Sequence, residues 1–283
     1  MKQQTSQLVE LLIKEMQFRN YSSRTIKTYS THLMDVEKYF KLTLDHIAIQ
    51  KFKDYLHRRI TVDKISPSSI NQYISAFKIL QVDVLKREWD QIIVKRPRRE
   101  KRLPDILSIS EVESLISVTK NLKHKALLML AYSSGLRRQE VQEIKPKAID
   151  SARMQIHVEQ GKGKKDRYTI LSTKTLEILR QYYKLEKPSC YLFESQGRKG
   201  QKLSESTLTE IVKQNAKKAG IKKNISFHTL RHCFATHLLE NGVNLRLIQQ
   251  FMGHSSIKTT TVYLHLVNIK LGNVASPLDS MNI

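Results

Sequence analysis

A basic, proline-containing stretch divides this chain into two parts, and the division limits the folds open to it. Residues 95–104 read KRPRREKRLP, with six basic residues, two prolines and no apolar repeat. Because proline lacks a backbone donor and fixes one dihedral angle, neither a helix nor a strand is expected to continue through this stretch. A chain of 283 residues also has the length of two ordinary domains. We therefore expect a domain at 1–94, an interdomain linker at 95–104 and a second domain at 105–283.

Apolar residues recur at helical spacing in four segments of the first domain, which predicts four short helices. In the clearest segment, Ser66 can cap the helix and Pro67 suits its first position. The apolar positions are Leu8, Leu12 and Met16; Ile26, Tyr29, Leu33, Val36 and Phe40, entered through Ser22 or Ser23; Ile49, Phe52 and Leu56; and Ile70, Ile74, Phe77 and Val84. The first domain is expected to be a small bundle of four helices.

The second domain contains further helical patterns. Ser110 and Glu113 have the spacing of a capping box, which predicts the start of a helix there. A helix over residues 126–132 is expected to end near Gly135, because glycine favours the left-handed conformation that closes helices. The remaining helices are expected at 173–185, 205–219, 228–240, 244–251 and 256–265.

A β-hairpin is predicted within this second domain. Residues 153–159 alternate apolar and polar side chains, a glycine-rich basic turn follows, and residues 167–171 return as a second strand. The fold class is therefore expected to be mainly α with a small β-sheet, an α+β fold.

Net charge is the strongest feature of the composition. The chain has 49 Lys and Arg against 26 Asp and Glu, a formal charge of +23, which indicates a polyanionic partner. DNA, RNA and anionic membrane all qualify, but no basic amphipathic helix stands out. No apolar run approaches the ~20 residues of a membrane span, and no signal peptide is apparent. We expect a nucleic-acid partner, no membrane association, and a cytoplasmic protein associated with the bacterial nucleoid.

The two cysteines argue against disulfide or zinc chemistry. Cys190 and Cys233 lie far apart in the sequence, whereas disulfide frameworks and structural zinc sites need more ligands at close spacing. We expect no metal ligands and no cofactor.

The densest group of residues able to do chemistry lies between 226 and 266. His228 and Arg231 are three residues apart on one predicted helix and share a face. His254 follows a short helix, and Tyr263 comes nine residues later. Taken singly, such residues are usually core, surface or structural groups. Together they meet the needs of metal-free phosphodiester cleavage: a nucleophile, a fixed cation for the phosphoryl oxygens, and a proton-transfer group.

Five segments in order resemble the tyrosine recombinase (phage integrase) family. They are Ser134-Gly135-Leu136-Arg137 with Glu140 three residues on, Gly161-Lys162-Gly163, HTLRH at 228–232, FMGH at 251–254, and Tyr263. The helical first domain and basic linker fit the core-binding domain of that family, so the resemblance extends over most of the chain. It is strongest to the compact Xer-like and integrative-element integrases.

The resemblance implies a role for each matching residue. Tyr263 would be the nucleophile that forms a 3′-phosphotyrosyl intermediate, and Arg137 and Arg231 would hold the scissile phosphate. Lys162 would protonate the leaving 5′-hydroxyl, and His228 would accept a proton near the tyrosine. His254 would hydrogen-bond the phosphate.

The resemblance also implies the partners of the reaction. Two domains would grip duplex DNA from opposite faces, and a homotetramer would exchange strands through a Holliday junction without metal or ATP. Accessory DNA-bending proteins could assist.

Neighbouring residues receive other interpretations. Arg138 is expected at the surface or on the DNA backbone, and Lys164 and Lys165 share the turn with Lys162. His232 and His237 are expected to pack or to support the site.

Three other functions compete with recombination. A zinc hydrolase is disfavoured because the HExxH-like spacing of His228 and His232 lacks its glutamate. A type IB topoisomerase would use the same nucleophile and arginines. A non-catalytic DNA-binding regulator would explain the charge but not the complete set of reactive residues.

Overall fold

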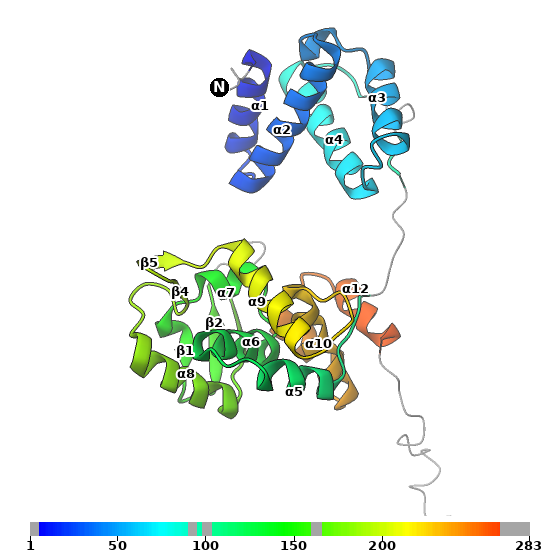
Figure 1. The fold of residues 1–283 in the computed structure, drawn as a ribbon. Coiled ribbons are helices and arrows are strands. Elements are labelled where there is room, and N and C mark those ends of the chain that lie inside the picture. Colours follow the sequence, from blue (N-terminus) through cyan, green and yellow to red (C-terminus); the bar gives the residue numbers. More distant parts are fainter. Residues whose placement is uncertain (1–5, 90–94, 98–103, 160–165, 267–283) are drawn as a thin grey trace, which may run out of the picture. The chain divides into compact units, whose positions relative to one another are not determined.

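A computed structural model describes residues 6–89, 95–97, 104–159 and 166–266. The chain divides into two units, Met1–Lys101 and Arg102–Ile283 (Figure 1). Each unit has an apolar core of its own.

Four α-helices make up the N-terminal unit, which confirms the predicted bundle. They are α1 (Gln7–Phe18), α2 (Ser23–Phe40), α3 (Ile49–Thr61) and α4 (Pro67–Ile79), with a short 3-10 turn η1 (Leu44–His46) and a π-helical turn η2 (Leu80–Val84). Ser22 caps α2, and Ser66 with Pro67 begins α4 as predicted. The rings of Phe52 and Phe77 stack at 3.9 Å in the core, which joins α3 to α4.

Helices also dominate the C-terminal unit. They are α5 (Ile109–Ser117), α6 (Leu122–Ser134), α7 (Arg138–Glu143), α8 (Thr173–Glu186), α9 (Glu205–Lys218), α10 (Phe227–Glu240), α11 (Leu245–Met252) and α12 (Ile257–Thr260), with 3-10 turns η3 (Pro146–Ala148) and η4 (Thr261–His265). The mainly helical class with small sheets is therefore confirmed. The helix α7 has no counterpart in the sequence prediction, because six residues are too short for a periodic pattern.

The predicted hairpin forms the larger sheet of this unit. Strands β2 (Gln155–Val158) and β3 (Arg167–Ile170) pair antiparallel, with Ile156 opposite Thr169, and β1 (Ile149–Asp150) joins the other edge of β2. Ile156 and Val158 are buried, as the alternation predicts. A second hairpin, β4 (Glu194–Ser195) with β5 (Arg198–Lys202), was not predicted, because the sequence RKGQK has no apolar alternation.

The predicted capping box is wrong by two residues. Ser108 and Glu111 form it, rather than Ser110 and Glu113: the Ser108 backbone N–H donates to the Glu111 carboxylate at 2.7 Å, and the Glu111 N–H donates to the Ser108 hydroxyl at 3.1 Å. Both pairs have the same spacing. When the helix starts at Ser108, Leu107 just before the cap and the valine at the fourth helical position are both buried. These are the two positions that pack together in a hydrophobic staple.

The helix α6 lies at the centre of the C-terminal unit. It packs against α8 and α10, and α10 in turn contacts α11 and η4 (Figure 1). Gly135 closes α6 in the left-handed conformation, as predicted, with φ of +60°. A Cβ atom there would lie 2.3 Å from the Phe234 ring, so the turn before Arg137 requires glycine both for its backbone and for its packing against α10.

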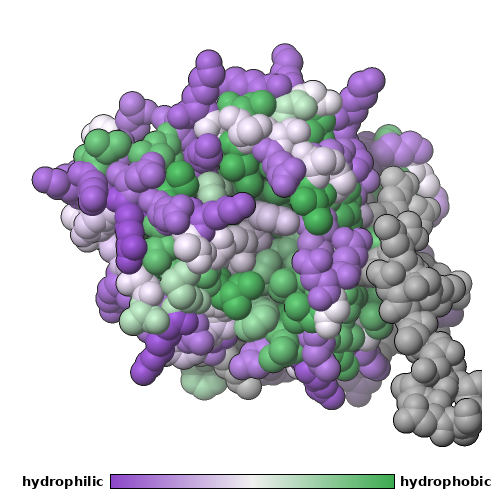
Figure 2. Space-filling view, turned by 90° about the horizontal axis from the view of Figure 1, so that it is seen from below, coloured by the Kyte–Doolittle hydropathy of each residue, from purple (hydrophilic) through white to green (hydrophobic). Residues whose placement is uncertain are grey.

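Hydrophilic and apolar side chains share the face of the molecule that Figure 2 shows. In the face shown in Figure 2, purple hydrophilic residues project along the edges and surround the green apolar ones. In the parts of the chain that the structure describes, no helix is long and apolar enough to cross a membrane.

Candidate active site

Residues from four separate segments line one cavity in the C-terminal unit. Its volume is about 480 Å³. Arg137 comes from the start of α7, the pair His228 and Arg231 from α10, His254 from the turn after α11, and Tyr263 from η4. The structure therefore brings together all of the predicted site residues except Lys162, which lies outside the described residues together with Lys164 and Lys165.

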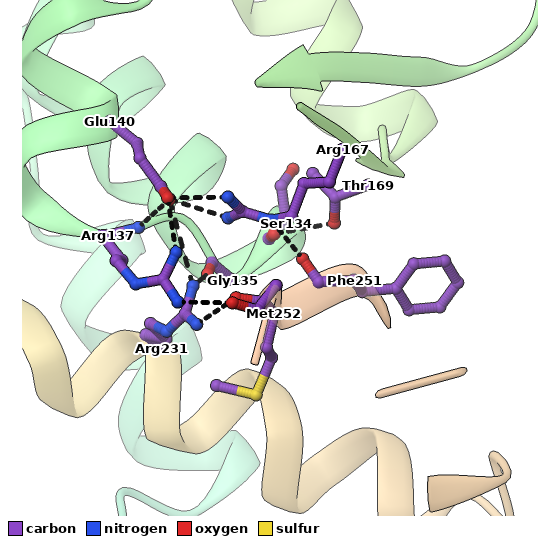
Figure 3. Close-up of polar contacts among 10 residues, drawn as sticks. Ser134, Gly135, Arg137, Glu140, Arg167, Thr169, Arg231, Phe251 and Met252 are labelled. Carbon is purple, nitrogen blue, oxygen red and sulfur yellow. Dashed lines mark hydrogen bonds and ion pairs between the residues drawn. The ribbon is translucent and has the colours of Figure 1, made fainter. Parts of the chain in front are cut away.

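Backbone carbonyls hold the two cavity arginines. Arg231 donates through Nη1 to the Gly135 carbonyl and through Nη2 to the Met252 carbonyl (Figure 3). Arg137 donates through Nη2 to the Gly253 carbonyl at 2.9 Å. Because neutral carbonyls accept these bonds, they fix both guanidinium groups without cancelling their charge.

Arg231 is 4% exposed, so little water reaches its charge. Burial and the nearby charge of Arg137 lower the pKa of Arg231 to about 9, although Glu140 raises it. The guanidinium still carries its proton at neutral pH. A charge with so little hydration interacts strongly with an oxyanion that enters the cavity.

The carboxylate of Glu140 lies among three guanidinium groups. Both of its oxygens accept from Arg167 at 2.7 Å, Oε1 accepts from Arg137 Nη1 at 2.7 Å, and Oε2 accepts from the Arg137 backbone N–H at 2.6 Å. Arg231 Nη1 lies 4.0 Å from Oε2. Burial alone would raise the pKa of Glu140, but the bonds and charge of Arg167 and Arg137 outweigh it and lower the pKa to about 2.

This lowered pKa predicts how the stability of the protein depends on pH. A carboxylate whose pKa falls on folding stabilises the fold above its unfolded pKa and loses that contribution as pH falls toward its folded pKa. A shift from 4.5 to about 2 corresponds to about 3 kcal/mol. We expect Glu140→Gln to lower the free energy of unfolding most at pH 7, and expect roughly half of that difference to disappear by pH 3.

Urea denaturation of the wild type and of the Glu140→Gln variant at a series of pH values measures this difference. Glu159→Gln is the matched control, because Glu159 pairs with lysines at the surface. A difference between Glu140→Gln and the wild type that stays constant from pH 7 to pH 3 would contradict the expectation.

Tyr263 is almost completely enclosed. It is 3% exposed and packs in a small apolar cluster with Phe234, Ala235, Ile248 and Met252. Burial raises its pKa to about 12, although the charges of Arg231 and Arg137 act in the opposite direction. The Tyr263 phenol is therefore protonated at neutral pH.

The Tyr263 hydroxyl contacts His232 rather than the expected His228. His232 Nδ1 lies 3.0 Å from the hydroxyl. Burial, with the nearby His228 and Arg231, lowers the pKa of His232 to about 4, so the ring is neutral and can accept the phenol proton in a hydrogen bond. The sequence predicts that His232 packs or supports the site, and the structure adds that it contacts the tyrosine hydroxyl itself. Its position four residues after His228, on the same helix face, was the available signal.

The other two histidines line the cavity beside Tyr263. His254 Nδ1 lies 3.0 Å from the Thr260 hydroxyl, and its ring is nearly parallel to that of Tyr263. Burial and the charges of Arg231 and Arg137 lower the pKa of His254 to about 4. Burial also lowers the pKa of His228. Both rings can be neutral at pH 7, the form that exchanges protons or donates one hydrogen bond.

Two neighbours of the site have partners within the domain. Arg138 forms an ion pair with Glu205 on α9 at 2.5 Å and its side chain is 28% exposed, and its contact with the DNA backbone stays a prediction. His237 is buried between the Tyr132 hydroxyl and the Leu107 carbonyl, as predicted for a packing residue. Within the described residues, no group of three or more His, Cys, Asp or Glu side chains is arranged to hold a metal ion.

Comparison with known families assigns the chain to a class of protein. Residues 105–268 match the phage integrase family, and residues 8–91 match the phage integrase N-terminal SAM-like domain. The chain belongs to the phage integrase family of tyrosine recombinases.

Individual relatives agree with this assignment. The chain is 33% identical to a tyrosine recombinase of Thermosipho africanus over 88% of this chain and 91% of that protein. It is 31% identical to the tyrosine recombinase XerD of Staphylococcus saprophyticus, over 92% of this chain and 94% of XerD.

Solved structures show the same fold. A XerH site-specific recombinase in a post-cleavage complex with its difH substrate aligns with a TM-score of 0.72 at 24% identity, over 98% of this chain and 85% of XerH. A XerA recombinase aligns with a TM-score of 0.55 at 28% identity, over 94% of this chain and 95% of XerA.

Proposed function

We propose that this enzyme is a site-specific recombinase that cuts and rejoins duplex DNA through a 3′-phosphotyrosyl intermediate. The observation that carries the proposal is the cavity in which Tyr263 meets Arg137, Arg231 and three histidines. A buried phenol beside fixed cations suits an attack on a phosphodiester, whose developing negative charge the guanidinium groups stabilise.

The cleavage step conserves the number of phosphodiester bonds. The Tyr263 oxygen attacks phosphorus, a P–O bond to tyrosine forms and the P–O5′ bond breaks. The phenol proton passes to His228, and Lys162 gives a proton to the leaving 5′-oxygen. Arg137 and Arg231 hold the non-bridging oxygens, and His254 donates a hydrogen bond to one of them. Because the new ester stores the energy of the broken bond, religation needs neither metal nor ATP.

Double-stranded DNA is the proposed partner. The net charge of +23 favours a polyanion, and the two arginines that line the cavity suit the oxygens of a phosphodiester. We propose that the domain at 1–94 and the domain at 105–283 bind opposite faces of the duplex, joined by the basic linker at 95–104. Strand exchange would then run through a Holliday junction in a homotetramer, with DNA-bending proteins as accessories where the site requires them.

The test is the covalent adduct itself. The wild-type protein first selects its sequence from a pool of random duplexes, and that sequence is then made as a nicked duplex that traps the cleaved strand. We expect an adduct that survives denaturing electrophoresis and forms with EDTA and without ATP, with the 3′-phosphate on the peptide that contains Tyr263. Supercoil relaxation without recombinant product would favour a topoisomerase instead.

The histidine that accepts the phenol proton can be assigned by the same assay. A general base contributes about 10²–10⁴-fold to a rate. We expect His228→Gln to slow adduct formation about 100-fold, because His228 is the proposed base, and His232→Gln, which removes only the hydrogen bond to the hydroxyl, to slow it less than about tenfold. The reverse order of the two rates would move the base role to His232.

A further inference from the structure

A third arginine, Arg167 on β3, is buried beside the site although it does not line the cavity of Tyr263. It is 8% exposed. Its two Nη atoms hold both oxygens of Glu140, and its Nε donates to the Phe251 carbonyl at 2.8 Å (Figure 3). One side chain therefore connects β3, the first turn of α7 and the end of α11.

The ion pair between Arg167 and Glu140 determines how strongly the Glu140 carboxylate pairs with the other arginines of the site. Three guanidinium groups and one carboxylate leave this cluster a net charge of +2. The bidentate pair with Arg167 occupies both carboxylate oxygens, the strongest geometry for such a pair. Without Arg167, Glu140 would keep the ion pair that Arg137 Nη1 already makes with its Oε1 at 2.7 Å, and Oε2 would be open to the other cavity arginine. Arg231 already lies 4.0 Å away.

The second contact supports the turn that holds the cavity arginines. Gly253 is in the left-handed conformation, and a Cβ atom there would lie 2.6 Å from Arg167 Cδ. The side chain of Arg167 thus packs directly under this turn. The carbonyls of Met252 and Gly253, in the same turn, accept from Arg231 and Arg137.

We propose that Arg167 is a positioning residue for the two catalytic arginines. It shares the Glu140 carboxylate with Arg137, keeps that carboxylate from pairing fully with Arg231, and fixes the turn at 251–253, so that the remaining N–H groups of the two cavity arginines stay available to the phosphate. This inference rests on the proposed function, because the rate it concerns is that of cleavage.

The experiment measures adduct formation on the nicked duplex over a range of protein concentrations. Arg167→Gln is expected to lower the rate at saturating protein about 100-fold, with the half-saturating concentration changed less than about threefold. Adding Glu140→Gln to this variant removes the carboxylate charge that has lost its Arg167 partner. The double variant E140Q/R167Q restores the net charge of +2 and is expected to react at least about tenfold faster than Arg167→Gln alone.

The rescue separates positioning from a general structural role. If Arg167 only stabilised the fold, the double variant would form the adduct no faster than Arg167→Gln, when both are assayed below their unfolding temperatures. The matched control is Arg19→Gln, which removes a similar bidentate pair with Asp83 in the N-terminal unit and should leave the rate unchanged.

Each outcome decides the inference. An Arg167→Gln rate within about threefold of wild type, or a double variant as slow as the single one, overturns it while the proposed function stands. If Arg167→Gln does not fold, the double variant decides alone: a rate within about 30-fold of wild type supports the inference, and a slower one overturns it. If the wild type and Arg19→Gln both form no adduct, the proposed function fails and the inference with it.

Discussion

Tyr263→Phe is expected to lower the rate of covalent adduct formation by a factor of at least about 10⁴, because phenylalanine has no oxygen to bond to phosphorus. The substitution removes one atom from a side chain whose ring packs against Phe234, Ile248 and Met252. The ring packing is retained, and only the hydrogen bond to His232 is lost. The variant should therefore fold and bind DNA while failing to cleave it.

Denaturing electrophoresis of the nicked duplex, labelled on the strand that is cut, measures this loss. DNA binding by gel shift and the unfolding midpoint are measured on the same preparation, so that an inactive protein is distinguished from an unfolded one. Tyr183→Phe, an exposed tyrosine on α8, is the matched control. An adduct formed by Tyr263→Phe at a measurable fraction of the wild-type rate would show that another residue is the nucleophile.

Arg231→Lys is expected to give the second largest loss, on the order of 10³-fold in the rate of adduct formation. The positive charge remains, but the planar fork does not. In the wild type that fork donates to the Gly135 and Met252 carbonyls, which orients the rest of the guanidinium toward the cavity. A lysine ammonium is a single point with free rotation, and it cannot hold two fixed carbonyls and a phosphate in the same plane.

Saturating protein concentrations separate this effect from weaker binding. The rate at saturation should fall, and the half-saturating concentration should change little, because an interaction made mainly in the transition state is lost. Arg180→Lys, an exposed arginine on α8, provides the matched control. If Arg231→Lys keeps more than a tenth of the wild-type rate, charge alone is sufficient and the bidentate geometry is not required.

Much of the fold could be predicted because the signals are local. Ser66 and Pro67 identify the start of α4, Gly135 identifies the end of α6, and the alternation before 159 identifies β2. The choice between Ser108 and Ser110 as the cap of α5 could not be predicted in this way. Both have a glutamate three residues on, and only the burial of Leu107 in the core of the domain distinguishes them.

The residues of the cavity were available from the sequence, but their contacts were not. The pattern HTLRH places His228, Arg231 and His232 within about one helical turn. It does not say which histidine meets the tyrosine, because the path of the chain from α10 to η4 decides that. His232 and Tyr263 are 31 residues apart in the sequence and 3.0 Å apart in the structure.

The sequence by itself determined the class of the protein, the helical architecture and the reactive residue types, because periodicity, capping and short motifs depend only on neighbours along the chain. The tertiary structure alone decided the electrostatics of the site. Arg167 and Glu140 are separated by 27 residues, and nothing local marks them as partners. They pair because the fold brings the Arg167 side chain of β3 to the first turn of α7, where the Glu140 side chain is only 8% exposed, and a buried carboxylate requires a cation within reach.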